Sequence, residues 1–173
     1  MLESSEVLNN QAVRLAYNGE YPEAIACLKR AITVEKENHL LWFNLALTYR
    51  DAGDFQSAKE SMEYSHRLCP GNEDIIEALA VLCINMGLMD DAMYYCITGF
   101  ELDDLNPNFW NTAGVIHFQI EEYEEASEFF EHAVSICPHH YDALYNLRDC
   151  YEQLGNKAGY EECERKLKEA GSR

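Results

Sequence analysis

Small residues recur in this chain at a spacing of 34 residues, and this spacing restricts the fold more than any other feature. The recurring glycines are Gly19, Gly53 and Gly87. Two further sets keep the same spacing: Ala24, Ala58, Ala92 and Ala126, and Ala12, Ala46, Ala80 and Gly114. No gap or insertion interrupts it from residue 5 to the C-terminus. A unit of this size buries little apolar surface alone, so it must stack against copies of itself.

Residues 39–72 show the pattern of one unit most clearly. The large and small apolar residues of its first half recur at the spacing of one helix face: Trp42, Leu45, Ala46 and Tyr49. Gly53 then interrupts the pattern, and a second helical spacing follows: Phe55, Ala58, Met62 and Ser65. Pro70-Gly71 closes the unit. The unit is therefore predicted to be a helix, a tight turn, a second helix and a stop. The alanines lie where the two helices must approach closely.

This pattern resembles the tetratricopeptide repeat (TPR) family, in its period, its tryptophans 42 and 110, its turn glycines and its closing prolines 70 and 138. The resemblance implies an all-α, right-handed α-solenoid of about five helix-turn-helix repeats, forming a single domain over residues 1–173. The repeats span residues 5–38, 39–72, 73–106, 107–140 and 141–173.

Two repeats depart from the pattern. The fifth has Arg148, Tyr160 and Leu167 at its three small positions, so it is expected to be a degenerate, capping repeat. The fourth has Glu121-Glu122 in place of the turn glycine. We expect that turn to form without a positive φ, which a glutamate disfavours.

The amino-acid composition restricts which class of partner and which cellular compartment are expected. The chain has 31 Asp and Glu against 13 Lys and Arg, a net charge of −18. This is the opposite of the basic surface that binding to nucleic acid or to an anionic membrane needs. The seven cysteines are scattered without a C-x-x-C motif, which favours free thiols in a reducing compartment. Neither a secretory signal nor a membrane-length apolar stretch is visible, and the predicted location is cytoplasmic.

No motif for chemistry stands out in the sequence. It contains no H-E-x-x-H metal motif and no glycine-rich phosphate loop. The histidines at 139 and 140 are predicted to lie in a solvated turn, and the glutamates between 121 and 131 on a solvated helix face. The prediction is a protein without catalytic residues, metal or cofactor, and not an enzyme.

In the TPR family, the first helices of successive repeats line a concave groove, at repeat positions 2, 5, 6, 9, 12 and 13. Carrying those positions onto this sequence predicts a peptide-binding groove. Its residues are Asn10, Val13, Tyr17, Phe43, Asn44, Leu47, Arg50, Glu77, Val81, Ile84, Asn111, Ile116, Tyr145, Asn146 and Asp149.

The predicted groove is apolar in the middle and acidic around it. Asn10, Asn44 and Asn146 share the position at which other family members hydrogen-bond an extended peptide backbone. Arg50 is the one basic residue, and Val13 replaces an asparagine, so the carboxylate clamp of the heat-shock co-chaperones is not predicted. The predicted function is that of a scaffold, adaptor or co-chaperone. It binds an extended or helical segment of a protein partner, basic and apolar in character.

Three alternatives stay open. The chain is a self-associating structural protein, which predicts an exposed apolar end at Val7, Leu8 or Leu15 and a homo-oligomer. It is a secretion-type chaperone, which holds apolar segments of export substrates. Or it is an enzyme or ligand-binding protein with a deep pocket around His117.

Overall fold

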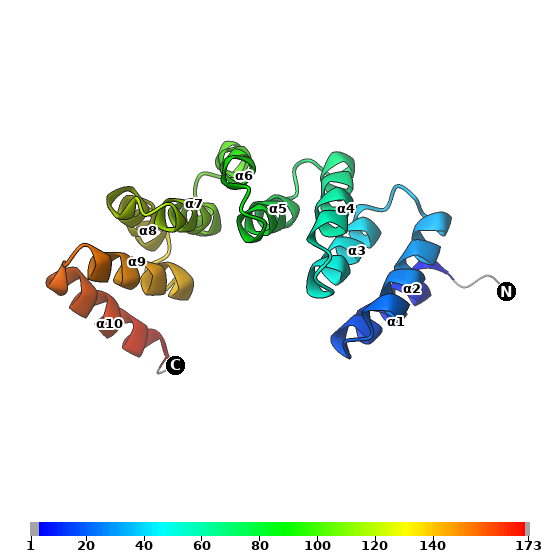
Figure 1. Cartoon of the computed structure of the whole chain (residues 1–173), viewed down its shortest axis with the longest axis horizontal. Helices are drawn as coiled ribbons and strands as arrows, with labels where there is room; N and C mark the ends of the chain where they lie inside the picture. The colour runs from blue at the N-terminus through cyan, green and yellow to red at the C-terminus, as the bar shows by residue number, and fades with distance from the viewer. Residues whose placement is uncertain (1–3, 172–173) are drawn as a thin grey trace. The chain divides into compact units, whose positions relative to one another are not determined.

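The computed structural model describes residues 4–171, and within them the protein consists of ten α-helices without a strand (Figure 1). The first helices of the five repeats are α1 (Ser5–Tyr17), α3 (His39–Asp51), α5 (Glu73–Asn85), α7 (Pro107–Gln119) and α9 (Tyr141–Gln153). The second helices are α2 (Tyr21–Val34), α4 (Phe55–Leu68), α6 (Met89–Leu102), α8 (Tyr123–Ile136) and α10 (Lys157–Gly171). The predicted all-α helix-turn-helix architecture is confirmed. None of these helices has both the length and the apolar composition needed to cross a bilayer.

The 34-residue spacing sets where each first helix begins. The residue before it accepts a hydrogen bond from the helix backbone through its side chain in all five repeats: Ser4, Asn38, Asn72, Asn106 and His140. Such caps satisfy a backbone N–H that has no partner within the helix. His140 therefore caps a helix, accepting from the Ala143 N–H at 3.1 Å, and its Nε2 lies 2.8 Å from Asn108 Oδ1.

The turn between the two helices of a repeat uses a left-handed residue each time. Gly53 has φ +82°, and the glycines at 19, 87 and 155 are similar. Glu121 occupies the corresponding place with φ +65°, so the expectation of a turn without positive φ is wrong. The reason is the backbone pairing: the Glu122 N–H donates to the His117 carbonyl at 3.0 Å, as Asp54 does to Tyr49 in repeat 2. That bond needs a left-handed residue between its partners, whatever the side chain.

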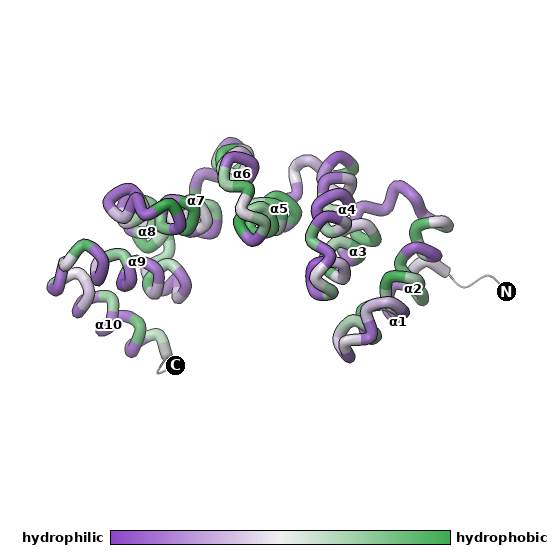
Figure 2. The backbone as a smooth tube through the Cα atoms, viewed as in Figure 1, coloured by the Kyte–Doolittle hydropathy of each residue, from purple (hydrophilic) through white to green (hydrophobic). Residues whose placement is uncertain are grey.

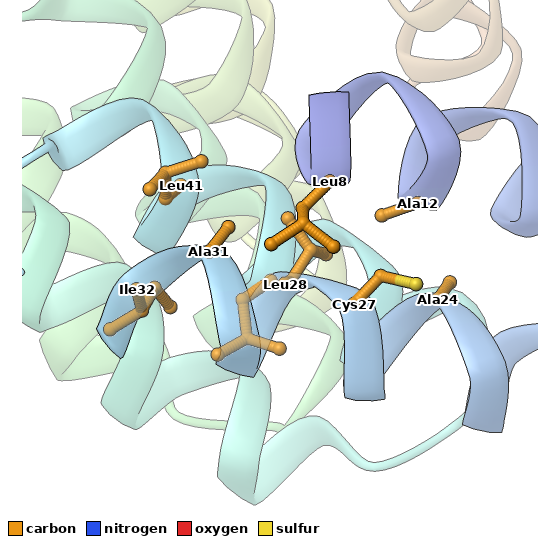
Figure 3. Close-up of a cluster of buried hydrophobic side chains, with 9 residues drawn as sticks. Leu8, Ala12, Ala24, Cys27, Leu28, Ala31, Ile32 and Leu41 are labelled. Atoms are coloured by element: carbon orange, nitrogen blue, oxygen red, sulfur yellow. The ribbon is translucent and has the colours of Figure 1, made fainter. Parts of the chain in front are cut away.

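The helices group into two compact units, residues 1–86 with α1–α5 (unit 1) and residues 87–173 with α6–α10 (unit 2). Each unit is described by itself, and the single domain over residues 1–173 stays a prediction. In unit 1, Leu8, Leu28 and Leu41 bring α1, α2 and α3 into one apolar cluster (Figure 3). In unit 2, Phe130 and Leu144 belong to a cluster of α8, α9 and α10 that also holds Cys163.

The small residues lie at close approaches, as predicted. Ala12, Ala24, Ala46 and Ala58 have no exposed surface. A Cβ atom added to Gly114 would lie 2.5 Å from the Phe130 ring, closer than atoms in proteins approach. These positions therefore set the distance between helices.

Repeat 5 has Arg148 where the other repeats have a small residue, and Arg148 forms an ion pair with the second helix. Arg148 Nη1 donates to Glu164 Oε1 at 3.0 Å, which links α9 to α10. The guanidinium also lies 4.1 Å from the Tyr145 ring centre and bonds Asp149 at 2.7 Å. The outer face of α10 carries exposed ion pairs, including Arg165 with Glu162. A polar outer face is what a capping repeat requires.

Candidate functional site

A hollow of about 300 Å³ lies between α3 and α5 of unit 1, and we call it the α3–α5 hollow. Its lining consists of Phe43, Leu47, Arg50, Asp74, Glu77, Ala78 and Val81. The α3 residues are spaced by four and three, and the α5 residues by three, one and three, so each set forms one helix face. All seven stand at predicted groove positions of their repeats, and the structure brings them together around one hollow.

The walls of the α3–α5 hollow are apolar and its charged groups are mostly acidic. Phe43 and Leu47 are half-buried, and Val81 is 39% exposed. Arg50 Nη2 lies 2.8 Å from Asp51 Oδ1, so its positive charge is compensated on its own helix. Asp74 and Glu77 place two acidic side chains beside the apolar wall. The combination suits an apolar group that carries a neighbouring positive charge.

Beside this hollow, α1 and α3 are joined by two asparagines. Asn44 Nδ2 donates to Asn9 Oδ1 at 2.8 Å. In unit 2, Asn146 Nδ2 donates to Asn111 Oδ1 at 2.9 Å between α9 and α7. The pairs occupy the same repeat positions, the fifth of one repeat and the sixth of the next. At the α3–α5 hollow, these positions hold Phe43 and Ala78 instead.

A second hollow of about 240 Å³ lies between α7 and α9, lined by Val115, Phe118, Gln119, Phe130, Asn146 and Asp149. Two of its polar groups already have partners within the unit. Asn146 bonds Asn111, and Asp149 accepts from Arg148 at 2.7 Å. Asn146 and Asp149 therefore offer a ligand less hydrogen-bonding capacity than side chains without these bonds would. The hydrogen bond to Asp149 also raises the pKa of Arg148, which stays a cation.

The remaining predicted groove residues differ in how far their side chains are exposed. Asn10, Val13 and Tyr17 are exposed on α1, outside the two hollows. Tyr145 is exposed and lies against Arg148. Ile84 and Ile116 are buried, at 8% and 3% exposure, and offer a ligand little surface. Ile84 is at position 12, at the edge of the groove stripe. Ile116 is at position 10, one residue after the groove position held by Val115, and the residues at position 10 in repeats 2, 3 and 5 (Thr48, Leu82 and Cys150) are buried as well.

Three further residues stand at groove positions 5, 2 and 6 of their repeats, as the family pattern predicts: Asn9, Asp74 and Ala78. Asp74 and Ala78 line the α3–α5 hollow, and Asn9 completes the amide pair with Asn44. Asn9 and Asn111 are three repeat lengths apart. Phe118 and Phe130 line the second hollow although their spacing is that of core residues.

The alternatives meet mixed evidence. Of the three residues expected at an exposed apolar end, Val7 is exposed, Leu8 is buried and Leu15 packs on the core. His117 stacks on Phe129 with ring centres 5.0 Å apart, and its Nδ1 lies 2.7 Å from Glu122 Oε2. Within residues 4–171, no three His, Cys, Asp or Glu side chains gather in a way that could hold a metal ion.

Known proteins share both sequence and fold with this chain. The BBSome complex member BBS4 of Bos taurus is 28% identical over 130 residues, which cover 75% of this chain and 25% of that protein. The chain thus spans about a quarter of the length of this relative.

Two solved structures show the same fold. MamA from Desulfovibrio magneticus RS-1 superposes with a TM-score of 0.80 at 16% identity, covering 99% of this chain and 98% of that one. YrrB, described as a TPR protein with an unusual peptide-binding site, superposes with a TM-score of 0.68 at 20% identity, covering 94% and 84%.

The family is shown by direct matches of its repeat. Tetratricopeptide repeat models match residues 9–73 and residues 107–140. The matches lie in both units, and the second coincides with repeat 4 as the spacing defines it. The chain therefore belongs to the tetratricopeptide repeat family, whose repeats form protein–protein interaction modules.

Proposed function

We propose that this protein is a non-catalytic adaptor whose α3–α5 hollow binds a segment of another protein. The bound segment presents a bulky apolar side chain next to a Lys or Arg. The observation that carries the proposal is the hollow itself, with apolar walls from two successive first helices and carboxylates beside them.

The size and chemistry of the α3–α5 hollow support this ligand. Its volume of about 300 Å³ is at the lower end for ligand sites and suits a side chain better than a whole cofactor. Phe43, Leu47 and Val81 offer apolar contact, which contributes about 25 cal/mol for each Å² removed from water. Asp74 and Glu77 attract the positive charge and orient the segment.

The neighbouring amides provide a means of holding a peptide backbone. A side-chain amide has two N–H donors and an oxygen that accepts. Asn44 uses one donor on Asn9, which fixes its orientation and keeps further hydrogen-bonding capacity. An extended segment that leaves the hollow toward α1 would pass this pair.

The relatives support a binding role of this kind. One is named as a member of a multiprotein complex, and another is described as having a peptide-binding site. We infer a scaffold or adaptor as the cellular role, with a chaperone for apolar segments as the finer alternative.

The seven free cysteines support a reducing, cytoplasmic location. Burial raises the pKa of Cys150 to about 12, so that thiol stays protonated and unreactive at neutral pH.

Selection from a library of random peptides tests the proposal. Peptides are selected on the wild-type protein and counted again on Leu47→Glu/Val81→Glu, which places two carboxylates in the wall of the hollow. The matched control is Val7→Glu/Val34→Glu, which adds the same charge at exposed positions of α1 and α2. We expect peptides with an aromatic or branched apolar residue beside Lys or Arg, and we expect the hollow variant alone to lose them.

The added negative charge makes this test strict. It increases the attraction for a basic peptide, so a loss must come from the apolar wall. Equal recovery on the hollow variant and the wild type would refute the α3–α5 hollow as the site. Recovery of acidic peptides would refute the charge preference.

Self-association is a second candidate, favoured by the exposed Val13 and Tyr17 on α1. It predicts a mass in solution that rises with protein concentration. Sedimentation of the wild type and of Val13→Glu/Tyr17→Glu measures it directly. A monomer at all concentrations removes this candidate.

A further inference from the structure

The outer face of α6 differs from that of every other second helix in its apolar character. Tyr94 is 62% exposed and Ile97 is 49% exposed, and they lie three residues apart on one face. The buried residues of α6 are on the opposite face: Ala92, Tyr95, Cys96 and Gly99. Leu102 and Leu105 add exposed apolar surface at the C-terminal end of the helix. Figure 2 shows both hydrophobic and hydrophilic residues in α6.

The repeat register shows what normally occupies these places. At the position of Tyr94, the other second helices have Ala26, Glu60, Glu128 and Glu162. At the position of Ile97, they have Lys29, Glu63, Glu131 and Arg165. The packing of the repeat therefore does not require apolar residues here. An exposed pair of large apolar residues, at positions that are charged in most of the other second helices, indicates an interaction surface.

The Tyr94 ring has an aromatic neighbour on its own helix. It meets the buried Tyr95 ring edge to face, with centres 5.3 Å apart. A tyrosine side chain gives a large contact area at a low cost in conformational entropy. Tyr94 and Ile97 therefore form the apolar centre of this face.

The charge around this centre has one sign. Asp90 lies one helical turn before Tyr94, and Glu101 lies one turn after Ile97, and both are exposed. The 80 residues from Leu68 to Leu147 contain 15 Asp and Glu and no Lys or Arg. Most of the net charge of −18 thus lies in the part of the chain that includes α6.

We propose that the outer face of α6 is a second docking surface, which binds a basic amphipathic helix of a partner protein. The apolar stripe of that helix covers Tyr94 and Ile97, and its Lys and Arg side chains reach Asp90 and Glu101. A second copy of this chain does not fit the surface, because two such acidic faces repel each other. None of the residues of this surface lines the α3–α5 hollow, so the inference does not depend on the proposed function.

The test uses a synthetic 18-residue peptide with leucines at i, i+3, i+4 and i+7 and lysines elsewhere, which forms a basic amphipathic helix. Its binding is measured by fluorescence anisotropy at low and high salt. One control peptide has the same residues in an order that breaks the apolar stripe, and another has Glu in place of Lys. The variant is Tyr94→Glu/Ile97→Glu, which gives α6 the glutamates that α4 has at these positions.

A charge-matched variant, Ala26→Glu/Thr33→Glu, adds the same two carboxylates to exposed positions of α2. A neutral variant, Tyr94→Ala/Ile97→Ala, removes the apolar centre without adding charge. Circular dichroism checks that all variants keep their helix content.

We expect both α6 variants to weaken binding of the Leu/Lys peptide at least about tenfold. The α2 variant is expected to keep it. The hollow variant Leu47→Glu/Val81→Glu removes any binding of this peptide at the α3–α5 hollow, and it is expected to keep the part of the binding that the α6 variants lose. High salt and the broken stripe should each weaken it, and the Glu peptide should not bind.

Four results would overturn the proposal. These are unchanged binding to the α6 variants, loss in the hollow variant alone, equal binding of the Glu peptide, or a wild-type dimer that Tyr94→Glu/Ile97→Glu dissociates. The last result would make a second copy the occupant.

Discussion

Successive first helices meet in two chemically different ways within unit 1. Between α1 and α3, Asn44 donates to Asn9 at 2.8 Å. Between α3 and α5, the same repeat positions hold Phe43 and Ala78, and both line a hollow. Unit 2 repeats the amide pair between α7 and α9, with Asn146 and Asn111 at 2.9 Å. The fifth position of one repeat and the sixth of the next thus lie at the boundary between successive first helices, which we call the seam. The residues at these two positions determine whether the seam is polar or apolar.

This difference explains why the hollow is the better candidate for binding an apolar side chain. Each amide pair satisfies part of its own hydrogen-bonding capacity, and an apolar ligand there would cover polar groups at a cost in free energy. Phe43 and Ala78 impose no such cost. Covering the apolar pair with an apolar ligand therefore lowers the free energy of the system.

Exchanging the two seams should have the largest effect. Phe43→Asn/Ala78→Asn places the amide pair at the α3–α5 hollow. We expect the affinity for the selected basic-apolar peptides to fall by more than about tenfold, because the apolar contact is lost. Titration calorimetry measures the affinity, and the melting curve checks folding. The reciprocal variant, Asn9→Phe/Asn44→Ala, removes only the neighbouring amides and should lower the affinity less, and a similar fall in both variants would contradict the comparison.

The second-largest effect is expected when a helix–helix contact is overpacked. Ala58 is completely buried where α3 and α4 approach, and Ala58→Leu should lower the free energy of unfolding by about 1–3 kcal/mol through overpacking. Urea denaturation measures it. Gln56→Leu on the exposed face of the same helix is the control and should change stability little. An unchanged curve for Ala58→Leu would show that the repeat register is misplaced.

The turn of repeat 4 offers a stabilising change. Glu121 has φ +65° and Gly155, the same position in repeat 5, has φ +67°. Glu121→Gly should raise the free energy of unfolding by about 0.5–1 kcal/mol, because relief of the left-handed strain exceeds the added freedom of the unfolded chain. Gly155→Glu should lower it by about 1–2 kcal/mol. Space is not a factor, since a Cβ at Gly155 meets no atom within 4 Å. Opposite signs in urea denaturation are the expected outcome, and equal signs would exclude strain as the cause.

The smallest effect concerns the two amide pairs. Double-mutant cycles with alanine at Asn9 and Asn44, and at Asn111 and Asn146, should each give a coupling energy of about 0.5–1 kcal/mol. The same value in both units would show that the pairs are equivalent. Coupling in one unit alone would mean that the two hydrogen bonds differ in energy although their lengths are similar.

The repeat spacing predicts most of the fold because each unit repeats the same local signals. Caps, turn glycines and small residues recur together, and the helices begin at the residues that the spacing indicates. Glu121 shows the limit of this approach. Its side chain disfavours the turn, but the turn forms because the flanking helices and their backbone bonds are those of a TPR repeat.

The candidate site is predicted less completely, for a physical reason. Helical spacing assigns a residue to a face, but burial depends on the size and direction of the side chain and on its neighbours. Ile116 comes one residue after Val115, the repeat equivalent of Val81, and this step of one residue turns it toward the packed face: Val81 is 39% exposed and Ile116 is 3% exposed. The apolar face of α6 was overlooked because a groove of first helices does not involve second helices.

The most direct test of the α3–α5 hollow is a ¹⁵N–¹H spectrum of the labelled protein, recorded while the tightest selected peptide is added. We predict that the largest shifts occur at α3 and α5, in Phe43, Leu47, Ala78 and Val81. Shifts confined to α1, to α6 or to unit 2 would contradict the claim that this hollow binds the partner.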